Sequence, residues 1–316
     1  MKILGSGDLH LRFKKPALRL DESYCASQFD KVVEILNIAE EEECDVIVIS
    51  GDVFDDSDSS NYIEQLYIKL FSKFIEDTGI QIYCVAGQHD KRYHTKRLEN
   101  TTLGVLESAK ALKIIRNDKP IEYKERKVTF YGVSWGEEIP EIKDPDVCNV
   151  LLIHKMVLKD GPLWVGQENY LNGKSFLDRS GFDFIVSGDN HNRFSISNKR
   201  ETRHLVNPGS LMRSRVDQAQ HKPAVYIFDT ETKELEARRL TIEHPSKVLD
   251  VEKSRALKRA DDKMEKFVDG LDDTEGLDFD FIEIVYEIMN KSKSITDGVR
   301  SIVEEVFKLV GPTAKG

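Results

Sequence analysis

Side chains of the kinds that bind metal ions follow five short apolar runs in this sequence. The runs are KILGS (2–6), VIVIS (46–50), IQIYCVA (80–86), VLLIH (150–154) and FDFIVS (182–187). The polar groups at their ends are Gly7-Asp8-Leu9-His10, Gly51-Asp52-Val53-Phe54-Asp55, Gly87-Gln88-His89-Asp90, His154 and Gly188-Asp189-Asn190-His191. A mixture of oxygen and imidazole donors without a thiolate suits Mn²⁺, Fe²⁺ or Zn²⁺ and argues against a structural zinc knot.

Each of these groups, taken alone, also has a purely structural explanation. A Gly-Asp pair after a strand is commonly a helix cap or a turn, and a single histidine at a strand end is usually structural. The ordered set is the specific signal, because packing alone does not require ligand-type residues after five strands. We therefore expect these side chains to converge on one crevice beyond the carboxyl ends of the strands.

The elements that must position these groups are predicted from hydrophobic periodicity. The five runs are continuous and rich in Val and Ile, which is typical of strands buried on both faces. Residues 22–43 and 61–76 predict amphipathic helices between them. Residues 128–135 predict a further strand, and residues 204–230 predict two strands that could form a hairpin. The chain is thus expected to fold as a layered α/β sandwich.

The character of the sequence changes after about residue 245. A charged helix, a break rich in Gly and Asp, and a helix with apolar residues on one side follow each other there. We predict a main domain at 1–245 and a small C-terminal domain of α+β or helical character at 246–316. Its amphipathic helices could pack on each other, on the main domain or on a partner, and binding of DNA or of that partner is a candidate role.

Composition limits the classes of protein that this chain can belong to. A net charge of −10 argues against a protein that coats nucleic acid non-specifically, although a nucleic-acid enzyme needs only a local basic face. No apolar run approaches the ~18 residues of a membrane span, and the first residues do not resemble a signal peptide. Four scattered cysteines without a CxxC motif indicate free thiols. We expect a cytoplasmic location, in a bacterial cell or in the host if the gene is phage-encoded.

The order D-x-H, GD-x-x-D, G-[N/Q]-HD, H and G-x-x-H resembles the calcineurin-like metallophosphoesterase superfamily. Four sequence motifs are similar to those of its SbcD-like DNA-repair nuclease branch, including phage and bacterial members. They are GDVFD (51–55), AGQHD (86–90), GDNH (188–191) and VNPGSLMR (206–213). The resemblance covers roughly residues 1–230. It implies an α/β/β/α sandwich and hydrolysis of phosphodiester bonds with two divalent metal ions, Mn²⁺ or else Mg²⁺.

The same resemblance implies roles for individual residues. The first metal ion would be held by Asp8, His10, Asp52 and His191, and the second by Asp52, Gln88, His154 and Asp189, so that Asp52 bridges the two. His89 would stabilise the transition state or protonate the leaving oxygen. Asp55 or Asp90 could orient its imidazole, and the sequence does not choose between them.

Two ligands depart from the family pattern. Gln88 stands where the family has Asn, and Asp189 stands where it has His. Both substitutions keep a coordinating oxygen, so we interpret them as replaced ligands rather than lost ones. The added carboxylate predicts a preference for Mn²⁺ or Mg²⁺ over zinc. It also predicts a second metal ion that is bound more weakly, or only together with the substrate.

Basic residues follow three of the ligand loops and predict a track for a phosphate backbone. The substrate-binding candidates are Arg12, Lys91, Arg92, Arg193 and Arg213. The resemblance also implies two partners besides DNA. These are an SbcC-like coiled-coil ABC ATPase and a second copy of the chain, bound through residues 61–76 and 101–111, whose apolar faces could equally be core.

The leading hypothesis is therefore a metal-dependent DNA nuclease that acts in end processing, repair or recombination. Its preference for exonuclease or endonuclease cleavage stays open. One alternative is a stand-alone phosphodiesterase or phosphatase for nucleotides and other small phosphate esters. Another is a catalytically weakened subunit that binds DNA or the ATPase.

Overall fold

The computed structural model describes residues 1–92, 95, 97–162 and 167–255. Residues Met1–Ser254 form one compact unit, so helix α5 (Pro245–Val248) belongs with the main domain. Most of the predicted C-terminal domain at 246–316 lies outside the described residues, and its proposed separate fold and role stay predictions. No helix of the described chain is both long and apolar enough to cross a membrane.

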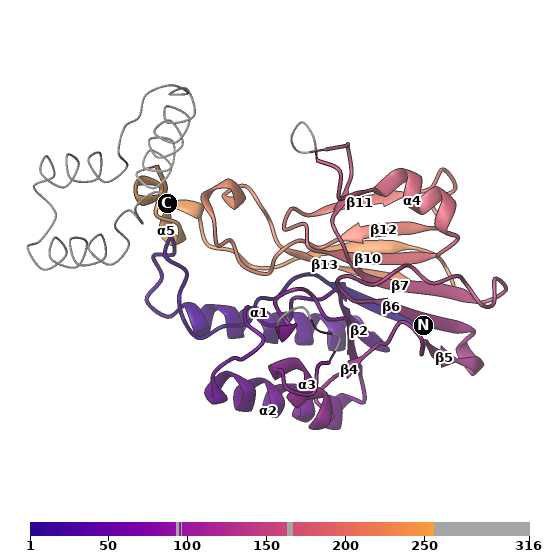
Figure 1. The fold of residues 1–316 in the computed structure, drawn as a ribbon, viewed down its shortest axis with the longest axis horizontal. Helices are drawn as coiled ribbons and strands as arrows, with labels where there is room; N and C mark the ends of the chain where they lie inside the picture. Colours follow the sequence, from indigo (N-terminus) through magenta and orange to yellow (C-terminus); the bar gives the residue numbers. More distant parts are fainter. Residues whose placement is uncertain (93–94, 96, 163–166, 256–316) are drawn as a thin grey trace, which may run out of the picture. The chain divides into compact units, whose positions relative to one another are not determined.

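Two six-stranded sheets form the centre of this unit (Figure 1). The first has the order β14-β13-β1-β2-β3-β4 and the second β11-β12-β10-β7-β6-β5. The first sheet contains β1 (Lys2–Ser6), β2 (Val46–Ile49), β3 (Gln81–Cys84), β4 (Lys113–Ile114), β13 (Ala224–Asp229) and β14 (Leu235–Arg239). The second contains β5 (Ile121–Tyr123), β6 (Val128–Val133), β7 (Cys148–His154), β10 (Phe184–Gly188), β11 (Phe194–Ser197) and β12 (His204–Asn207). A separate parallel pair is formed by β8 (Val157–Leu158) and β9 (Leu171–Asn172).

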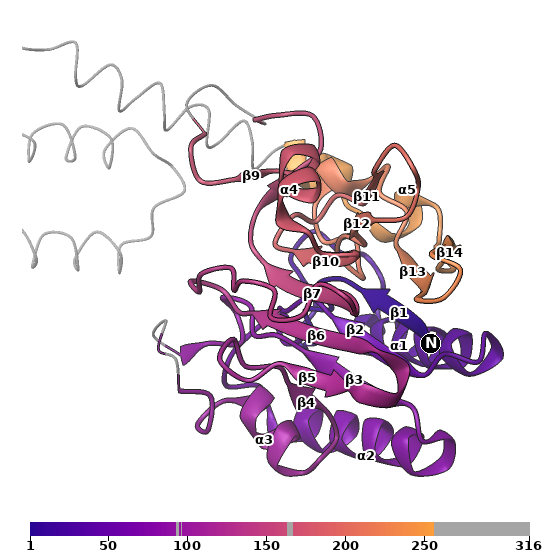
Figure 2. The same ribbon diagram turned by 90° about the vertical axis from the view of Figure 1, so that its right-hand side faces the viewer.

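Helices cover the outer faces of the two sheets, which confirms the layered sandwich. The helices are α1 (Tyr24–Glu41), α2 (Asn61–Thr78), α3 (Thr102–Ser108) and α4 (Gly173–Ser180), with short 3-10 turns η2 (Lys124–Arg126) and η3 (Val216–Gln218). Figures 1 and 2 show α1, α2 and α3 on one side of the sheets and α4 on the other. The order of layers is therefore α/β/β/α.

The five apolar runs are continuous because both faces of their strands are buried. In β2, Val46 and Val48 face the second sheet, whereas Ile47 and Ile49 pack under the helices. The core between the sheets also contains Val150 and Phe184 from the second sheet. A strand buried on both faces needs apolar residues at every position, since its side chains alternate between two cores. The expected strands are thus confirmed, distributed over two sheets.

The hairpin considered for residues 204–230 is wrong. Strand β12 pairs with β10 and β11 in the second sheet, whereas β13 pairs with β1 and β14 in the first. Gly209, with φ +73°, lies in the intervening turn, where the chain passes from one sheet to the other. Both segments have strand character, but a hairpin would leave the Lys2–Ser6 strand without the partner that β13 provides.

All four cysteines are free, and Cys44, Cys84 and Cys148 are buried. Burial raises the pKa of the Cys148 thiol to about 11 and that of Cys44 to about 12. These thiols therefore behave as small apolar core residues, as the scattered spacing predicted.

Candidate metal centre

The predicted ligands converge at the carboxyl ends of strands from both sheets. Parallel strands β1, β2 and β3 bring in the first three groups, and parallel strands β7 and β10 bring in the last two. Three donor residues have left-handed backbone: His10 (φ +47°), Asp52 (φ +44°) and Asp189 (φ +75°). Such conformations cost free energy in residues other than glycine and cluster at functional sites. The tight turns after the strands thus bring these side chains into one cluster.

Asp8, His10, Asp52 and His191 form one half of this cluster, which we call the imidazole half. The Nε2 atoms of His10 and His191 lie 3.1 Å apart. His191 Nε2 is 4.0 Å from Asp8 Oδ2, and His10 Nε2 is 3.7 Å from Asp52 Oδ2. Asp8 and Asp52 are fully buried. Ring nitrogens and carboxylate oxygens thus point at one another across a short gap.

Gln88, His154 and Asp189 form the other half, which we call the amide half. His154 Nε2 donates to Gln88 Oε1 at 2.8 Å, and Gln88 Nε2 donates to Asp189 Oδ1 at 3.3 Å. His154 Nδ1 donates to the Ser50 carbonyl at 2.7 Å. His154 Nε2 is also 3.5 Å from Asp52 Oδ2. One carboxylate therefore touches both halves, as expected for a bridging group.

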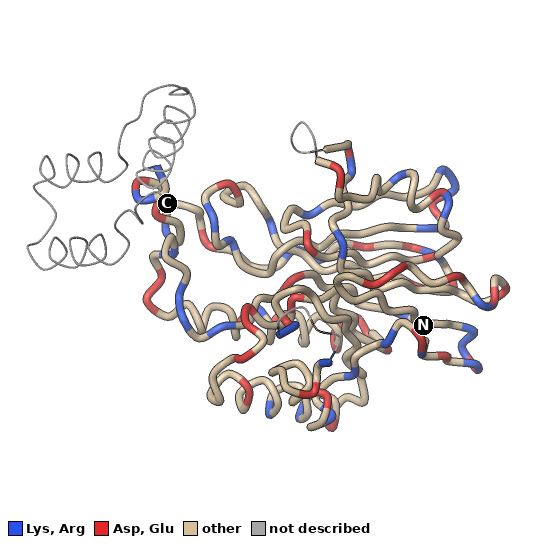
Figure 3. Tube along the Cα trace, in the orientation of Figure 1, with Lys and Arg blue, Asp and Glu red and all other residues tan. Residues whose placement is uncertain are grey.

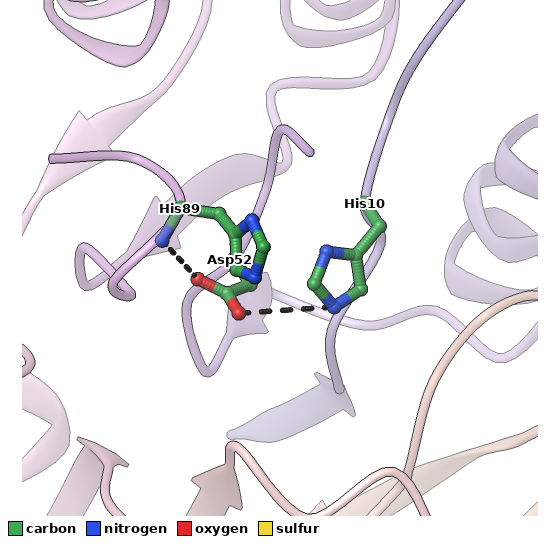
Figure 4. Close-up of side chains that lie close together, drawn as sticks. All are labelled: His10, Asp52 and His89. Carbon is green, nitrogen blue, oxygen red and sulfur yellow. Dashed lines mark hydrogen bonds and ion pairs between the residues drawn. The ribbon is translucent and has the colours of Figure 1, made fainter. Parts of the chain in front are cut away.

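His89 lies beside this shared carboxylate. Figure 4 shows the His10 and His89 rings on either side of Asp52, and the three residues hold ligand-type atoms within 4.8 Å of one another. The His89 main-chain N–H donates to Asp52 Oδ1 at 2.9 Å. Its Nδ1 donates to the main-chain carbonyl of Asp55 at 2.9 Å. This bond leaves Nε2 of the ring as the free nitrogen.

The two acids considered as partners of His89 have different surroundings. Asp55 meets His89 through its main-chain carbonyl, while its carboxylate pairs with Arg12 Nη1 at 2.8 Å. The buried Asp90 carboxylate accepts hydrogen bonds from the main-chain N–H groups of Val53, Phe54 and Gly87. Asp90 thus braces two ligand loops against each other, and the geometry favours Asp55 as the residue that orients His89.

Burial and charge give the histidines of the two halves opposite protonation. Burial lowers the pKa of His10 to about 3 and also lowers the pKa of His191. Burial opposes charge on His154 as well, but the neighbouring Asp52 and Asp8 carboxylates outweigh it and raise its pKa to about 10. Its two donated hydrogen bonds agree with a charged ring. Burial raises the pKa of Asp8.

These residues fit divalent metal ions. Asp8 Oδ2 and Asp52 Oδ2 are buried and accept no hydrogen bond, although an unpaired buried carboxylate oxygen is costly. Close packing also requires glycine beside them. A Cβ at Gly87 would lie 2.0 Å from Asp52 Oδ1, and a Cβ at Gly188 would lie 2.5 Å from Asp8 Oδ1. The oxygens are therefore held in place in a fixed cradle that a cation would satisfy.

Two buried glutamines support this cluster and were missed by the sequence analysis. Gln28 of α1 accepts from the Arg12 N–H at 2.9 Å and donates to the His10 carbonyl at 2.8 Å. Nε2 of Gln218 in η3 lies 3.3 Å from His191 Nδ1. Oε1 of the same side chain accepts hydrogen bonds from the main-chain N–H groups of Ser214 and Arg215. A polar residue on the apolar face of a predicted helix, as Gln28 is, is a sequence feature that could have identified it. No sequence feature identifies Gln218, because only the tertiary fold brings it to His191.

The basic candidates differ in how deeply their side chains are buried. Lys91 is buried and donates to the Trp135 carbonyl, and Arg213 is buried and donates to the Ala219 and Glu243 carbonyls. Arg92 is exposed, and Arg193 lines a pocket of about 570 Å³. Because of these hydrogen bonds, the guanidinium of Arg213 acts as a brace within the fold. Figure 3 shows basic and acidic residues interleaved along the chain.

Comparisons with known proteins agree with this geometry. A model of the calcineurin-like phosphoesterase family matches residues 1–193, a span that includes all seven candidate ligands. The SbcD subunit of the nuclease SbcCD from Staphylococcus epidermidis is 24% identical over 274 residues, which are 74% of this chain and 67% of that protein. The DNA double-strand break repair protein Mre11 of Sulfurisphaera tokodaii is 26% identical over 164 residues, 49% of this chain and 40% of the relative. A solved structure described as a novel archaeal phosphodiesterase matches with a TM-score of 0.40 and 15% identity, over 76% of this chain and 100% of that one.

Proposed function

Because the chain belongs to the calcineurin-like phosphoesterase family, we propose that it is a metal-dependent DNA nuclease that hydrolyses phosphodiester bonds. Hydrolysis of phosphate esters is the activity of the family. The choice of DNA rests on the two relatives, whose names describe a nuclease and a protein of double-strand break repair. The observation that carries the proposal is the pair of unpartnered carboxylate oxygens of Asp8 and Asp52 among converging imidazoles.

We assign the seven donors to two divalent ions. The first would be held by Asp8, His10, Asp52 and His191, and the second by Asp52, Gln88, His154 and Asp189. When bound, such ions lower the pKa of water and offset the charge of a phosphoryl group. Three carboxylates among the donors favour Mn²⁺ or Mg²⁺ over zinc.

His89 is proposed to handle the proton of the leaving oxygen. The Asp55 carbonyl holds its Nδ1–H, so that Nε2 is the nitrogen available to carry a proton to the substrate. Arg12 fixes the Asp55 carboxylate through a 2.8 Å ion pair and thereby positions this loop. Asp90 is a positioning residue that holds the same loop through the main-chain N–H groups of Val53 and Phe54.

The partners follow from the same relatives and are part of the proposal. The name of the Staphylococcus protein describes one subunit of an SbcCD complex, which supports an SbcC-like ATPase as the partner of this chain. A homodimer through α2 and α3 is a further proposal. Arg12, Arg92 and Arg193 remain candidates for the phosphate track, whereas Lys91 and Arg213 are buried and donate to main-chain carbonyls.

One assay separates this function from its two alternatives. The protein is incubated with Mn²⁺ and labelled single- or double-stranded DNA, and in parallel with a small chromogenic phosphodiester. We expect DNA cleavage that stops on chelation and that falls by about 10²–10⁴-fold in His89→Ala. His244→Ala, an exposed histidine just before α5, is the matched control. Turnover of the small ester alone indicates a stand-alone phosphodiesterase, and DNA binding without any turnover indicates a weakened binding subunit.

A further inference from the structure

We propose that Phe13 and Tyr62 form a stacking platform for an unpaired nucleobase at the rim of the metal centre, which makes single-stranded or frayed DNA the preferred substrate. The inference rests on the proposed nuclease function and names the substrate class of the same site. It is carried by two exposed aromatic rings, their connection to the catalytic loops and the charges around them.

The two rings form an exposed pair. Phe13 is 61% exposed and Tyr62 is 59% exposed, the highest values among the large apolar side chains that the structure describes. Their centroids lie 5.7 Å apart with the ring planes at 75°. Edge-to-face contact holds the two rings together, and more than half of each residue stays exposed. Single exposed apolar side chains are common, but two aromatic rings in contact present an ordered surface on which a planar group can stack.

Short connections join this pair to the catalytic loops. Phe13 follows Arg12, whose guanidinium pairs with the Asp55 carboxylate, and the Asp55 carbonyl holds His89. A bridge between Leu11 and Phe54 fixes the two loops in register. Phe13 comes three positions after the candidate ligand His10, so their Cα atoms lie within about 11 Å. A base on these rings would belong to a nucleotide close to the scissile phosphate.

The basic residues beside the pair suit a nucleic-acid strand. Lys14 and Lys15, directly after Phe13, are exposed, and Arg12 Nε is buried without a hydrogen-bond partner. The loop before Tyr62 carries the acids Asp56 and Asp58. Phosphates are therefore expected on the lysine side and the base on the rings. Cations interleaved with exposed aromatic rings are the usual composition of single-strand sites, because a duplex keeps its bases stacked within the helix.

The test compares aromatic deletions in the protein with base deletions in the substrate. Wild type, Phe13→Ala and Tyr62→Ala are assayed with Mn²⁺ on a short oligothymidylate and on a small chromogenic phosphodiester. We expect the ratio of oligonucleotide to small-ester turnover to fall roughly tenfold in each alanine variant. Phe13→Trp should keep the ratio, and Leu20→Ala, which removes another exposed apolar side chain, is the control.

A set of oligonucleotides with one abasic nucleotide at successive positions then locates the base. For the wild type, an abasic nucleotide at one position should lower kcat/KM roughly tenfold. For Phe13→Ala, the same abasic nucleotide should cause no additional loss, because the ring that stacks on the base is already absent. Additive losses would overturn the inference while leaving the nuclease function intact. Alanine variants that change the sedimentation of the protein but keep the turnover ratio would assign the rings to an interface between two copies, which also overturns it. If the wild type cleaves only the small ester, the proposed nuclease function fails first.

Discussion

The two halves of the metal centre share Asp52 but satisfy their polar atoms in different ways. In the imidazole half, His10 and His191 face each other at 3.1 Å and Asp8 Oδ2 has no hydrogen-bond partner. In the amide half, His154, Gln88 and Asp189 are joined by hydrogen bonds of 2.8 and 3.3 Å. The first arrangement leaves the Asp8 oxygen for a cation to satisfy, whereas the three side chains of the second are joined in a continuous hydrogen-bonded chain.

This difference predicts an order of metal binding. Burial lowers the pKa of both histidines in the imidazole half, so their lone pairs are available at neutral pH. In the amide half an ion must displace a proton from His154 and separate Gln88 from both of its neighbours. We therefore expect the imidazole half to bind its ion more tightly, which is consistent with the weaker second ion expected from Asp189.

The largest effect is expected at the residue that the halves share. Asp52→Asn keeps the size of the side chain but removes the charge next to His10 and His154. We expect both ions to be lost and DNA cleavage to fall about a thousandfold or more, because metal ions supply several kcal/mol of transition-state stabilisation. Metal content after dialysis and single-turnover cleavage measure the two effects. A variant that keeps one tightly bound ion would show that Asp52 does not bridge.

The pH dependence of metal binding distinguishes the halves next. The pKa of His154 is raised to about 10, so its ring keeps its extra proton through neutral pH and must release it on binding. Affinity for the second ion should then fall about tenfold for each unit by which pH decreases from 8 to 6. The lowered pKa values of His10 and His191 predict no such pH dependence for the first ion. Any pH dependence of the affinity for the first ion would come from Asp8. Mn²⁺ titrations at three pH values test this, and an affinity for the second ion that does not change with pH contradicts it.

A smaller effect should be confined to the imidazole half. Gln218 is fixed by two main-chain N–H groups and touches His191 Nδ1, so Gln218→Ala should release that ring. We expect affinity for the first ion to fall about tenfold, in the range seen when groups that orient metal ligands are removed. Gln218→Glu still accepts the two N–H groups and can also accept Nδ1–H, so it should bind the ion at least as well as wild type. Equal losses at both ions would instead indicate general loosening of the fold.

The sequence was sufficient for the strands and for the polar side chains that follow them, because both depend on local patterns. Continuous Val and Ile runs identify strands buried on two faces, and glycine followed by an acid marks the turn beyond three of the five runs. It could not show which runs share a sheet, since β3 and β7 look alike locally, and the expected hairpin failed for the same reason. The bracing roles of Gln218 and Arg213 depend on residues that only the tertiary fold brings near.

The smallest effect concerns the identity of the ion in the amide half. Asp189→His replaces a hard carboxylate by an imidazole and removes the acceptor of the Gln88 amide. We expect the affinity of the second metal position for zinc to rise about tenfold relative to its affinity for Mn²⁺, because imidazole suits zinc and carboxylate suits Mn²⁺. Binding of the first ion should not change. Gln88→Asn is the matched control, since it shortens the neighbouring ligand but keeps its amide oxygen, and it should leave the metal ranking as in wild type. If wild type and Asp189→His bind both metals with the same ranking and affinity, Asp189 does not set the preference of the second ion. In that case the hydrogen bonds among Gln88, His154 and Asp189 would be a structural feature of the crevice rather than a ligand set.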